Sequence, residues 1–260
     1  MDFLTGEYLI GAFMVLIRIT SLMLTAPFFS AGVFPVRVKV FTGLVLGFCL
    51  FPVIPVEISA VNMNMGFLDV IILVVKESLV GITMGLAGQI IFAGIQMSGQ
   101  IISLKMALSF ASIVDPMTRD QGGVVNQVLA LLGLLVFLHV GGDAMYLKAM
   151  MWSFEVVPVG TIQAELATPL FIEMTTYLFL IGFQLAAPFI VILFLIDMSF
   201  AIFARIMPQA NIFFISLPVK VGVGLLVFVA VIPFLPFAFE IMFDRLAHYI
   251  SLLLEAVSGN

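Results

Sequence analysis

The chain has 260 residues, of which 63% are hydrophobic and only 10% are charged. An average soluble domain is about 45–50% apolar and about 25% charged, so a soluble fold of this length could not hide the apolar surface. The composition therefore predicts an integral membrane protein and argues against a water-soluble helical bundle. The net charge is −5 and the basic residues are scattered singly, which gives no support to nucleic-acid binding or to a polybasic lipid anchor.

The sequence offers no constellation that would carry catalysis or hold a cofactor. It has no P-loop, no GxSxG or HExxH pattern, and one cysteine, Cys49, which we interpret as a small buried hydrophobe. Glu240, Asp244 and His248 follow one helical ridge, but the only other histidine is His139. We interpret the ridge as a solvated charged face, and we predict no enzyme activity, no cofactor and no metal site.

Seven apolar segments and one short amphipathic helix are expected along the chain. In chain order they occupy residues 8–34, 40–53, 67–104, 124–140, 143–158 (the amphipathic helix), 169–195, 212–232 and 237–257. The second would reach about 21 Å and the third about 57 Å, against a hydrocarbon core of roughly 30 Å. The fold class predicted is all-α, an integral membrane protein of long, kinked helical hairpins. Asp2 and Glu7 are unlike a basic secretory signal, so the first segment is expected to remain in the mature protein.

The stretch 195–224 places charges and helix breakers in sequence apolar enough for a membrane. Its polar residues and prolines are Asp197, Arg205, Pro208, Gln209, Asn211, Pro218 and Lys220. Such residues mark a functional site by default, because burying them in lipid is costly. Asp197 and Arg205 are separated by about 80° around a helix and about 12 Å along it, so they are not expected to pair. They either bond to other segments or subunits, or lie near water at a helix end.

Two further polar features lie in the segment 67–104. Gln89, Gln96 and Gln100 fall within roughly 20° of one line on a helix. This polar seam either faces a pore or another subunit, or bonds helices together inside one chain. Lys76 and Glu77 are adjacent and point about 100° apart, so each needs a partner on another segment.

Small residues at a spacing of four predict close helix packing in two places. Gly43 and Gly47 form one such step, and Gly81 and Gly85 form another. The spacing lets two helix backbones approach closely and carries no chemistry of its own.

Together these residues resemble the FliR family of flagellar type III protein export gate subunits, with a near relative in virulence-type secretion systems. The resemblance covers essentially the whole chain. It is carried most strongly by Asp197, Ser199, Arg205, Pro208, Gln209, Asn211, Phe213, Pro218, Lys220 and Gly222. It is supported by Arg18 with Pro27, Pro35 with Lys39, Glu77 with Gly81, and Asp115 with Pro116.

The resemblance implies a pore-forming core subunit of the export gate, which helps conduct unfolded flagellar proteins across the bacterial inner membrane at the flagellar basal body. The implied partners are FliP-like and FliQ-like gate subunits and FlhB-like and FlhA-like membrane components. The implied fold resembles a fusion, with a FliP-like part over residues 1–165 and a FliQ-like helical hairpin over 166–260. Residues 211–220 resemble the turn of that hairpin.

The resemblance also assigns roles to individual residues. A plug loop over residues 105–123 would help to close the pore, with Met106, Phe110, Ile113, Asp115, Pro116 and Met117. Contacts between subunits and the hairpin bend would involve Lys76, Glu77, Asp197, Arg205, Pro208, Gln209, Asn211, Pro218 and Lys220. The alternative is a stand-alone secondary transporter or ion channel with a broken helix between Pro208 and Pro218. That alternative predicts a second broken segment in the front half, where no copy of the pattern occurs.

Overall fold

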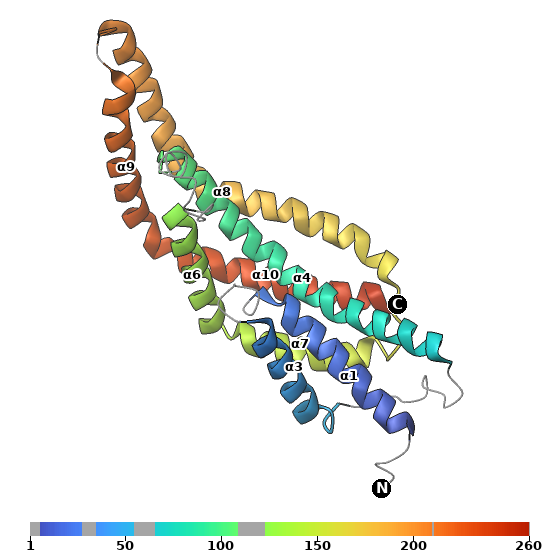
Figure 1. Ribbon diagram of the computed structural model, residues 1–260. Helices are drawn as coiled ribbons and strands as arrows, with labels where there is room; N and C mark the ends of the chain where they lie inside the picture. Colours follow the sequence, from blue (N-terminus) through green and yellow to red (C-terminus); the bar gives the residue numbers. More distant parts are fainter. Residues whose placement is uncertain (1–5, 28–34, 55–65, 109–122, 210, 260) are drawn as a thin grey trace. The chain divides into compact units, whose positions relative to one another are not determined.

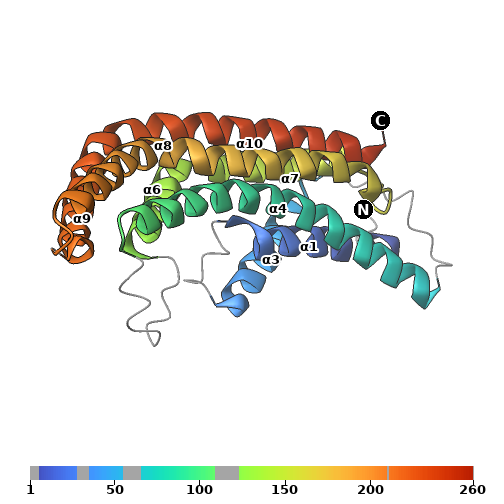
Figure 2. The ribbon, with the colours of Figure 1, turned by 90° about the horizontal axis from the view of Figure 1, so that it is seen from above.

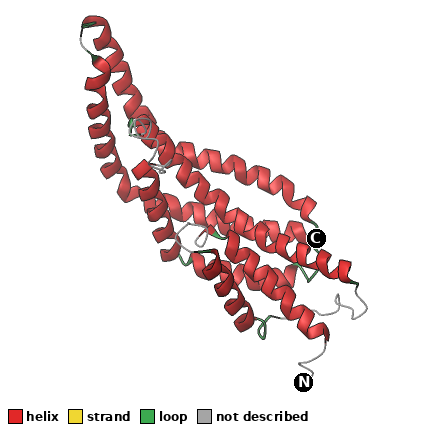
Figure 3. Ribbon diagram, in the orientation of Figure 1, coloured by secondary structure: helices red, strands yellow, loops and turns green. Residues whose placement is uncertain are grey.

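The computed structural model describes residues 6–27, 35–54, 66–108, 123–209 and 211–259. These residues form helices and turns, with no strand among them (Figure 3). The helices are α1 (Gly6–Thr25), α3 (Val36–Leu50), α4 (Phe67–Lys105), α6 (Gly123–His139), α7 (Gly142–Val156), η2 (Ala164–Ala167), α8 (Thr168–Ile206), α9 (Ile212–Val231), η3 (Ile232–Phe234) and α10 (Leu235–Ser258). The all-α class predicted from the sequence is confirmed.

The start of α3 differs from the prediction. The segment predicted to begin at residue 40 is helical from Val36, with Pro35 at its N-cap, so Arg37 and Lys39 belong to α3. Proline is tolerated there, since the first turn of a helix leaves its N–H groups without intrahelical partners. Cys49, expected to be buried, is exposed on α3.

Two prolines lie inside helices rather than ending them. Pro188 lies within α8, and Pro218 lies within α9. Each removes one backbone hydrogen bond, a loss that apolar membrane helices accommodate through neighbouring groups. The hairpin turn is consequently shorter than the predicted 211–220: it lies between the end of α8 at Ile206 and the start of α9 at Ile212.

The chain divides into two compact units, and each is described by itself. Unit 1 comprises residues 1–91, 141–175 and 243–260, and unit 2 comprises residues 92–140 and 176–242. Neither unit is a continuous stretch of the chain.

Unit 1 is organised around α1, which packs against α3 and α4 through glycines. A Cβ on Gly43 of α3 would lie 2.9 Å from Cα of Thr20, and one on Gly85 of α4 would lie 2.6 Å from Cβ of Thr25. These gaps are too small for any side chain, so the close approach predicted from the glycine spacing is confirmed. The pairing of α1 with α3 can be followed in Figure 1 and Figure 2.

The last helix of the chain completes unit 1. The backbone N–H of Gln163 donates to the carbonyl of Val257 over 2.9 Å, and the Tyr249 hydroxyl donates to Oε1 of Glu173 over 3.1 Å. These bonds join α10 to the segment before α8 and to the first turns of α8.

Unit 2 contains the last third of α4, together with α6, most of α8, α9 and the start of α10. The rings of Phe92 and Phe137 meet edge to face at 5.7 Å between centroids, which joins α4 to α6. The rings of Phe189 and Phe228 lie 6.0 Å apart and join α8 to α9. A Cβ on Gly224 of α9 would lie 2.5 Å from Cγ of Met106, so the buried Met106 side chain fills the space that this glycine leaves open.

Within the described residues, four long helical stretches are apolar enough to cross a membrane, and the number rises to five if the bent pair α6 and α7 counts as one span. The chain is therefore a multi-pass membrane protein. The burial of these stretches inside the chain differs: 44% for the best window of Tyr8–Thr25, but 28% for Glu165–Ile206 and 17% for Ile212–Ser258. The hairpin of α8 and α9 thus exposes most of its apolar surface to whatever surrounds it.

Candidate functional sites: a buried ion pair and a helical hairpin

A buried ion pair joins Arg18 on α1 to Glu77 on α4 inside unit 1. Nε of Arg18 donates to Oε2 of Glu77 over 2.6 Å, and the two side chains are 0% and 1% exposed. A lone charge at such a site is strongly disfavoured, so each residue is tolerable only because the other is present.

The rest of the Arg18 guanidinium binds the end of α7. Its Nη1 donates to the carbonyl of Ser153 over 2.9 Å, and its Nη2 donates to the carbonyl of Val157 over 3.0 Å. The guanidinium carbon also lies 4.1 Å from the centre of the Phe154 ring. Carbonyls at the C-terminal end of a helix carry partial negative charge, so they suit a cation. Arg18 therefore joins α1, α4 and the end of α7 at one point.

Lys76 and Glu77 bind opposite sides of one peptide segment. Nζ of Lys76 donates to the carbonyl of Gly160 over 2.8 Å, and the N–H of Gly160 donates to Oε1 of Glu77 over 2.9 Å. Gly160 has φ +84°, in the left-handed region that favours glycine, and a Cβ there would lie 2.6 Å from Cδ2 of Leu73. Lys76 and Glu77, which were each expected to need a partner on another segment, thus both bind the backbone of Gly160.

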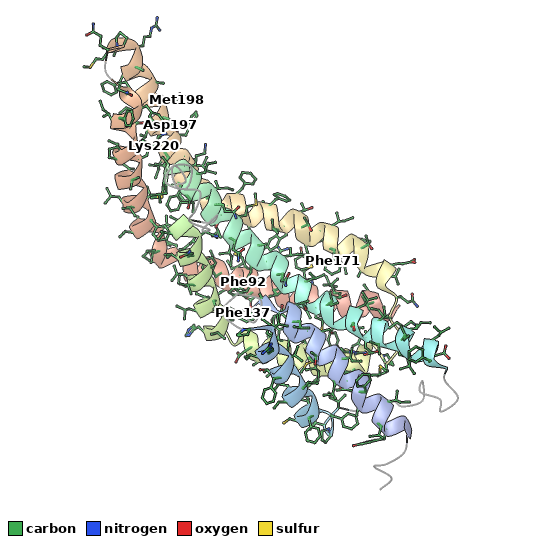
Figure 4. All side chains as sticks on the ribbon, in the orientation of Figure 1. Phe92, Phe137, Phe171, Asp197, Met198 and Lys220 are labelled. Carbon is green, nitrogen blue, oxygen red and sulfur yellow. The ribbon has the colours of Figure 1, made fainter. Side chains whose placement is uncertain are left out.

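In unit 2, the hairpin charges meet across the two helices. Nζ of Lys220 on α9 forms an ion pair with Oδ1 of Asp197 on α8, and the two labelled side chains lie side by side in Figure 4. The Lys220 side chain is 19% exposed and that of Asp197 is 40% exposed. Asp197 pairs with a charge on another segment of the same chain, which is one of the alternatives that the sequence left open, and not with Arg205.

The turn of the hairpin carries the remaining residues assigned to assembly. Arg205, Pro208, Gln209 and Asn211 are all exposed in and beside the turn. Pro218 lies one turn or more into α9 rather than in the bend. The assignment of these residues to subunit contacts stays a prediction.

The predicted polar seam divides between two environments. Nε2 of Gln89 donates to the carbonyl of Thr25 over 2.8 Å, so this amide bonds helices within the chain. Gln96 and Gln100 are exposed, and their orientation toward a pore stays a prediction. Ser103, which extends the seam, is buried, and its hydroxyl has no hydrogen-bond partner among the described residues.

Most of the predicted plug loop lies outside the described residues. This applies to Phe110, Ile113, Asp115, Pro116 and Met117. Met106, at the start of the loop, is described and is fully buried against Gly224.

The described residues bring together no group of three or more side chains able to hold a metal ion. On α10, Asp244 and His248 are exposed and Glu240 is half-buried, as a solvated charged ridge would be.

Neither the pairing of Arg18 with Glu77 nor that of Asp197 with Lys220 was predicted, although the sequence contains a signal for each. Arg18 and Glu77 have opposite charges in two apolar helices, and charges in such segments pair with one another. Asp197 and Lys220 lie at nearly equal distances in sequence from the hairpin turn, so folding the hairpin brings them level. Neither signal decides the partner alone, because Lys39, Lys76 and Arg205 offer other cations.

Long apolar helices, charges that pair inside the chain, and a weakly buried hairpin define a helical multi-pass membrane protein. The model of the family described as bacterial export proteins, family 1, matches residues 9–246. The chain belongs to this family and is a component of the flagellar export apparatus.

Relatives in distant bacteria agree with this assignment. The flagellar biosynthetic protein FliR of Escherichia coli K12 is 32% identical over 246 residues, covering 92% of both chains. FliR of Bacillus subtilis 168 is 29% identical over 83% of both chains, and FliR of Aquifex aeolicus VF5 is 28% identical over 90% of both. These relatives are named as biosynthetic proteins of the flagellum and not as enzymes.

Proposed function

We propose that this chain is a pore-forming core subunit of the flagellar type III export gate. In this role it sits in the bacterial inner membrane at the flagellar basal body and helps conduct unfolded flagellar proteins outward. FliP-like and FliQ-like subunits complete the pore, and FlhB-like and FlhA-like components adjoin it.

The observation that carries the proposal is the length of the apolar helices relative to a bilayer. α4 and α8 each have 39 residues, which corresponds to about 58 Å at about 1.5 Å per residue. A straight helix of this length, tilted by about 40°, would still extend roughly 45 Å along the membrane normal, against a core of roughly 30 Å. Lipid alone cannot cover such helices, so part of their apolar surface requires neighbouring protein.

The hairpin of α8 and α9 is the surface that most needs covering. Phe194, Leu195 and Ile202 of α8 are each at least half exposed, as are Leu226 and Val229 of α9. Small helical membrane subunits with apolar faces would supply this cover. The proposed likeness of residues 1–165 to a FliP-like subunit and of 166–260 to a FliQ-like hairpin would let this chain fit among such siblings.

Closure of the pore is assigned to residues 105–123 in this proposal. Met106 supports it by providing a fixed starting point, since its side chain is fully buried against Gly224 of α9. A closing segment that begins at an anchored residue can move without disturbing the helices on either side.

Purification in mild detergent tests the proposal. A tagged chain expressed with its genomic neighbours is expected to carry two other small apolar subunits through size-exclusion chromatography. A monomer that binds a small solute would instead support the stand-alone transporter. In the assembled complex, deletion of residues 110–117 is expected to raise ion conductance across a planar bilayer. An unchanged, tight bilayer would overturn the assignment of the plug.

A further inference from the structure

The ion pair between Asp197 and Lys220 joins two helices that are otherwise apolar at this level. Asp197 is on α8, and Lys220 is on α9 beyond the hairpin turn (Figure 4). The nearby hydroxyls do not bridge the helices. Ser199 donates to the carbonyl of Leu195, and Ser216 donates to the carbonyl of Phe213, each within its own helix.

Apolar contacts alone would hold the register of this hairpin weakly. One weakly buried apolar helix can slide along another and exchange contacts of similar strength, because dispersion and burial are not directional. The rings of Phe189 and Phe228 pack far from the hairpin turn. They therefore do not align the part of α8 and α9 that lies between these rings and the turn. A single polar pair is a known way to select one register among several apolar ones.

The ion pair disfavours any shift of α9 along α8. A shift of one helical turn moves the helices by about 5.4 Å, which separates the ammonium from the carboxylate. The Lys220 side chain is mostly enclosed, so water would not compensate fully for the lost partner. Arg205 cannot substitute for Lys220, because it lies about 12 Å further along the same helix as Asp197.

We propose that Asp197 and Lys220 form a register lock within a single chain, which aligns α8 with α9 before the hairpin meets any sibling subunit. The lock makes the exposed apolar faces of the two helices into one surface of fixed shape. The contribution to assembly rests on the proposed function, whereas the lock itself is a property of this chain alone.

Exchanging the charges of Asp197 and Lys220 distinguishes an ion pair within the chain from bonds to other subunits. Asp197→Lys and Lys220→Asp each place like charges together, so each is expected to lower recovery of the assembled complex roughly tenfold or more. The double variant Asp197→Lys/Lys220→Asp restores the pair and is expected to return recovery to within about twofold of the parent. A double variant as poor as either single variant would overturn the proposal, because both residues would then bind other subunits.

Cross-linking in a chain expressed without other subunits tests the register lock independently of the proposed function. In a Cys49→Ser chain expressed alone in membranes, Phe189→Cys/Phe228→Cys leaves the ion pair intact and is treated with a short bismaleimide. Linkage within the chain, seen as a faster-moving monomer on a denaturing gel, is the expected result. Adding Lys220→Ala to this variant removes the lock, and several-fold less linkage is expected. Equal linkage with and without Lys220→Ala, or linkage only between chains, would overturn the lock.

Discussion

Nε of Arg18 lies 2.6 Å from Oε2 of Glu77, and the two residues come from helices that begin far apart in the sequence. The same guanidinium reaches the end of α7, and the same carboxylate accepts the N–H of Gly160. One buried ion pair thus connects α1, α4, α7 and the loop after α7. This arrangement makes unit 1 sensitive to the loss of either charge.

Arg18→Ala is expected to destabilise the protein by about 3–5 kcal/mol, because it leaves the Glu77 carboxylate buried without its cation. Thermal or denaturant unfolding in detergent micelles measures the effect. Arg37→Ala is the matched control, since Arg37 is an exposed cation near the start of α3. Equal effects of the two variants would contradict a special role for Arg18.

Replacement of both charges by apolar residues is expected to be milder than loss of one. Arg18→Met/Glu77→Leu removes the unpaired charge that each single variant leaves behind, so its stability should exceed that of Arg18→Ala. The same unfolding measurement compares them. A double variant less stable than Arg18→Ala would show that the bond from the N–H of Gly160 to Glu77, which only the double variant loses, matters more than the unpaired charge.

Gly160→Ala is expected to be more harmful than Gly141→Ala, although the two glycines have similar backbone angles. Their φ values are +84° and +80°, so alanine is strained at both, by about 1–2 kcal/mol. Only Gly160 has a close neighbour, Leu73, whereas a Cβ on Gly141 would meet nothing within 4 Å. The difference in unfolding free energy between the variants therefore measures the tight packing at Gly160. No difference would mean that Leu73 moves aside freely.

Gly224→Leu is expected to destabilise unit 2 by about 1–3 kcal/mol, because the new side chain overlaps the buried Met106. Gly222→Leu on the same helix is the control, since a Cβ there would meet nothing within 4 Å. Thermal unfolding of both variants in the same detergent gives the comparison. If Gly224→Leu matched its control, Met106 would not be a fixed anchor for the segment that follows it.

The positions of most helices were predictable, because their apolar segments are long and bounded by glycine, proline or charged residues. Boundaries failed at the start of α3, where Pro35 is the N-cap, and at the end of α8, which continues past Asp197 to Ile206. Proline removes a donor but does not always end a helix, since a helix start has no partner to lose and an apolar helix can bend around the gap. The tight glycine contacts were predictable as a type of packing, but their partners on α1 were not.

The sequence by itself determined that this is an all-helical membrane protein of the export family, because composition, hydropathy and the order of polar residues are properties of the chain alone. Only the tertiary structure decided which charges satisfy one another. Arg18 could have met any acidic group, and Asp197 had several cations within reach along the sequence. Pairing Arg18 with Glu77 required α1 and α4, which are distant in the chain, to lie side by side, and pairing Asp197 with Lys220 required the hairpin of α8 and α9 to close in one register. Electrostatic pairing depends on distances of a few ångströms, which sequence spacing alone does not fix.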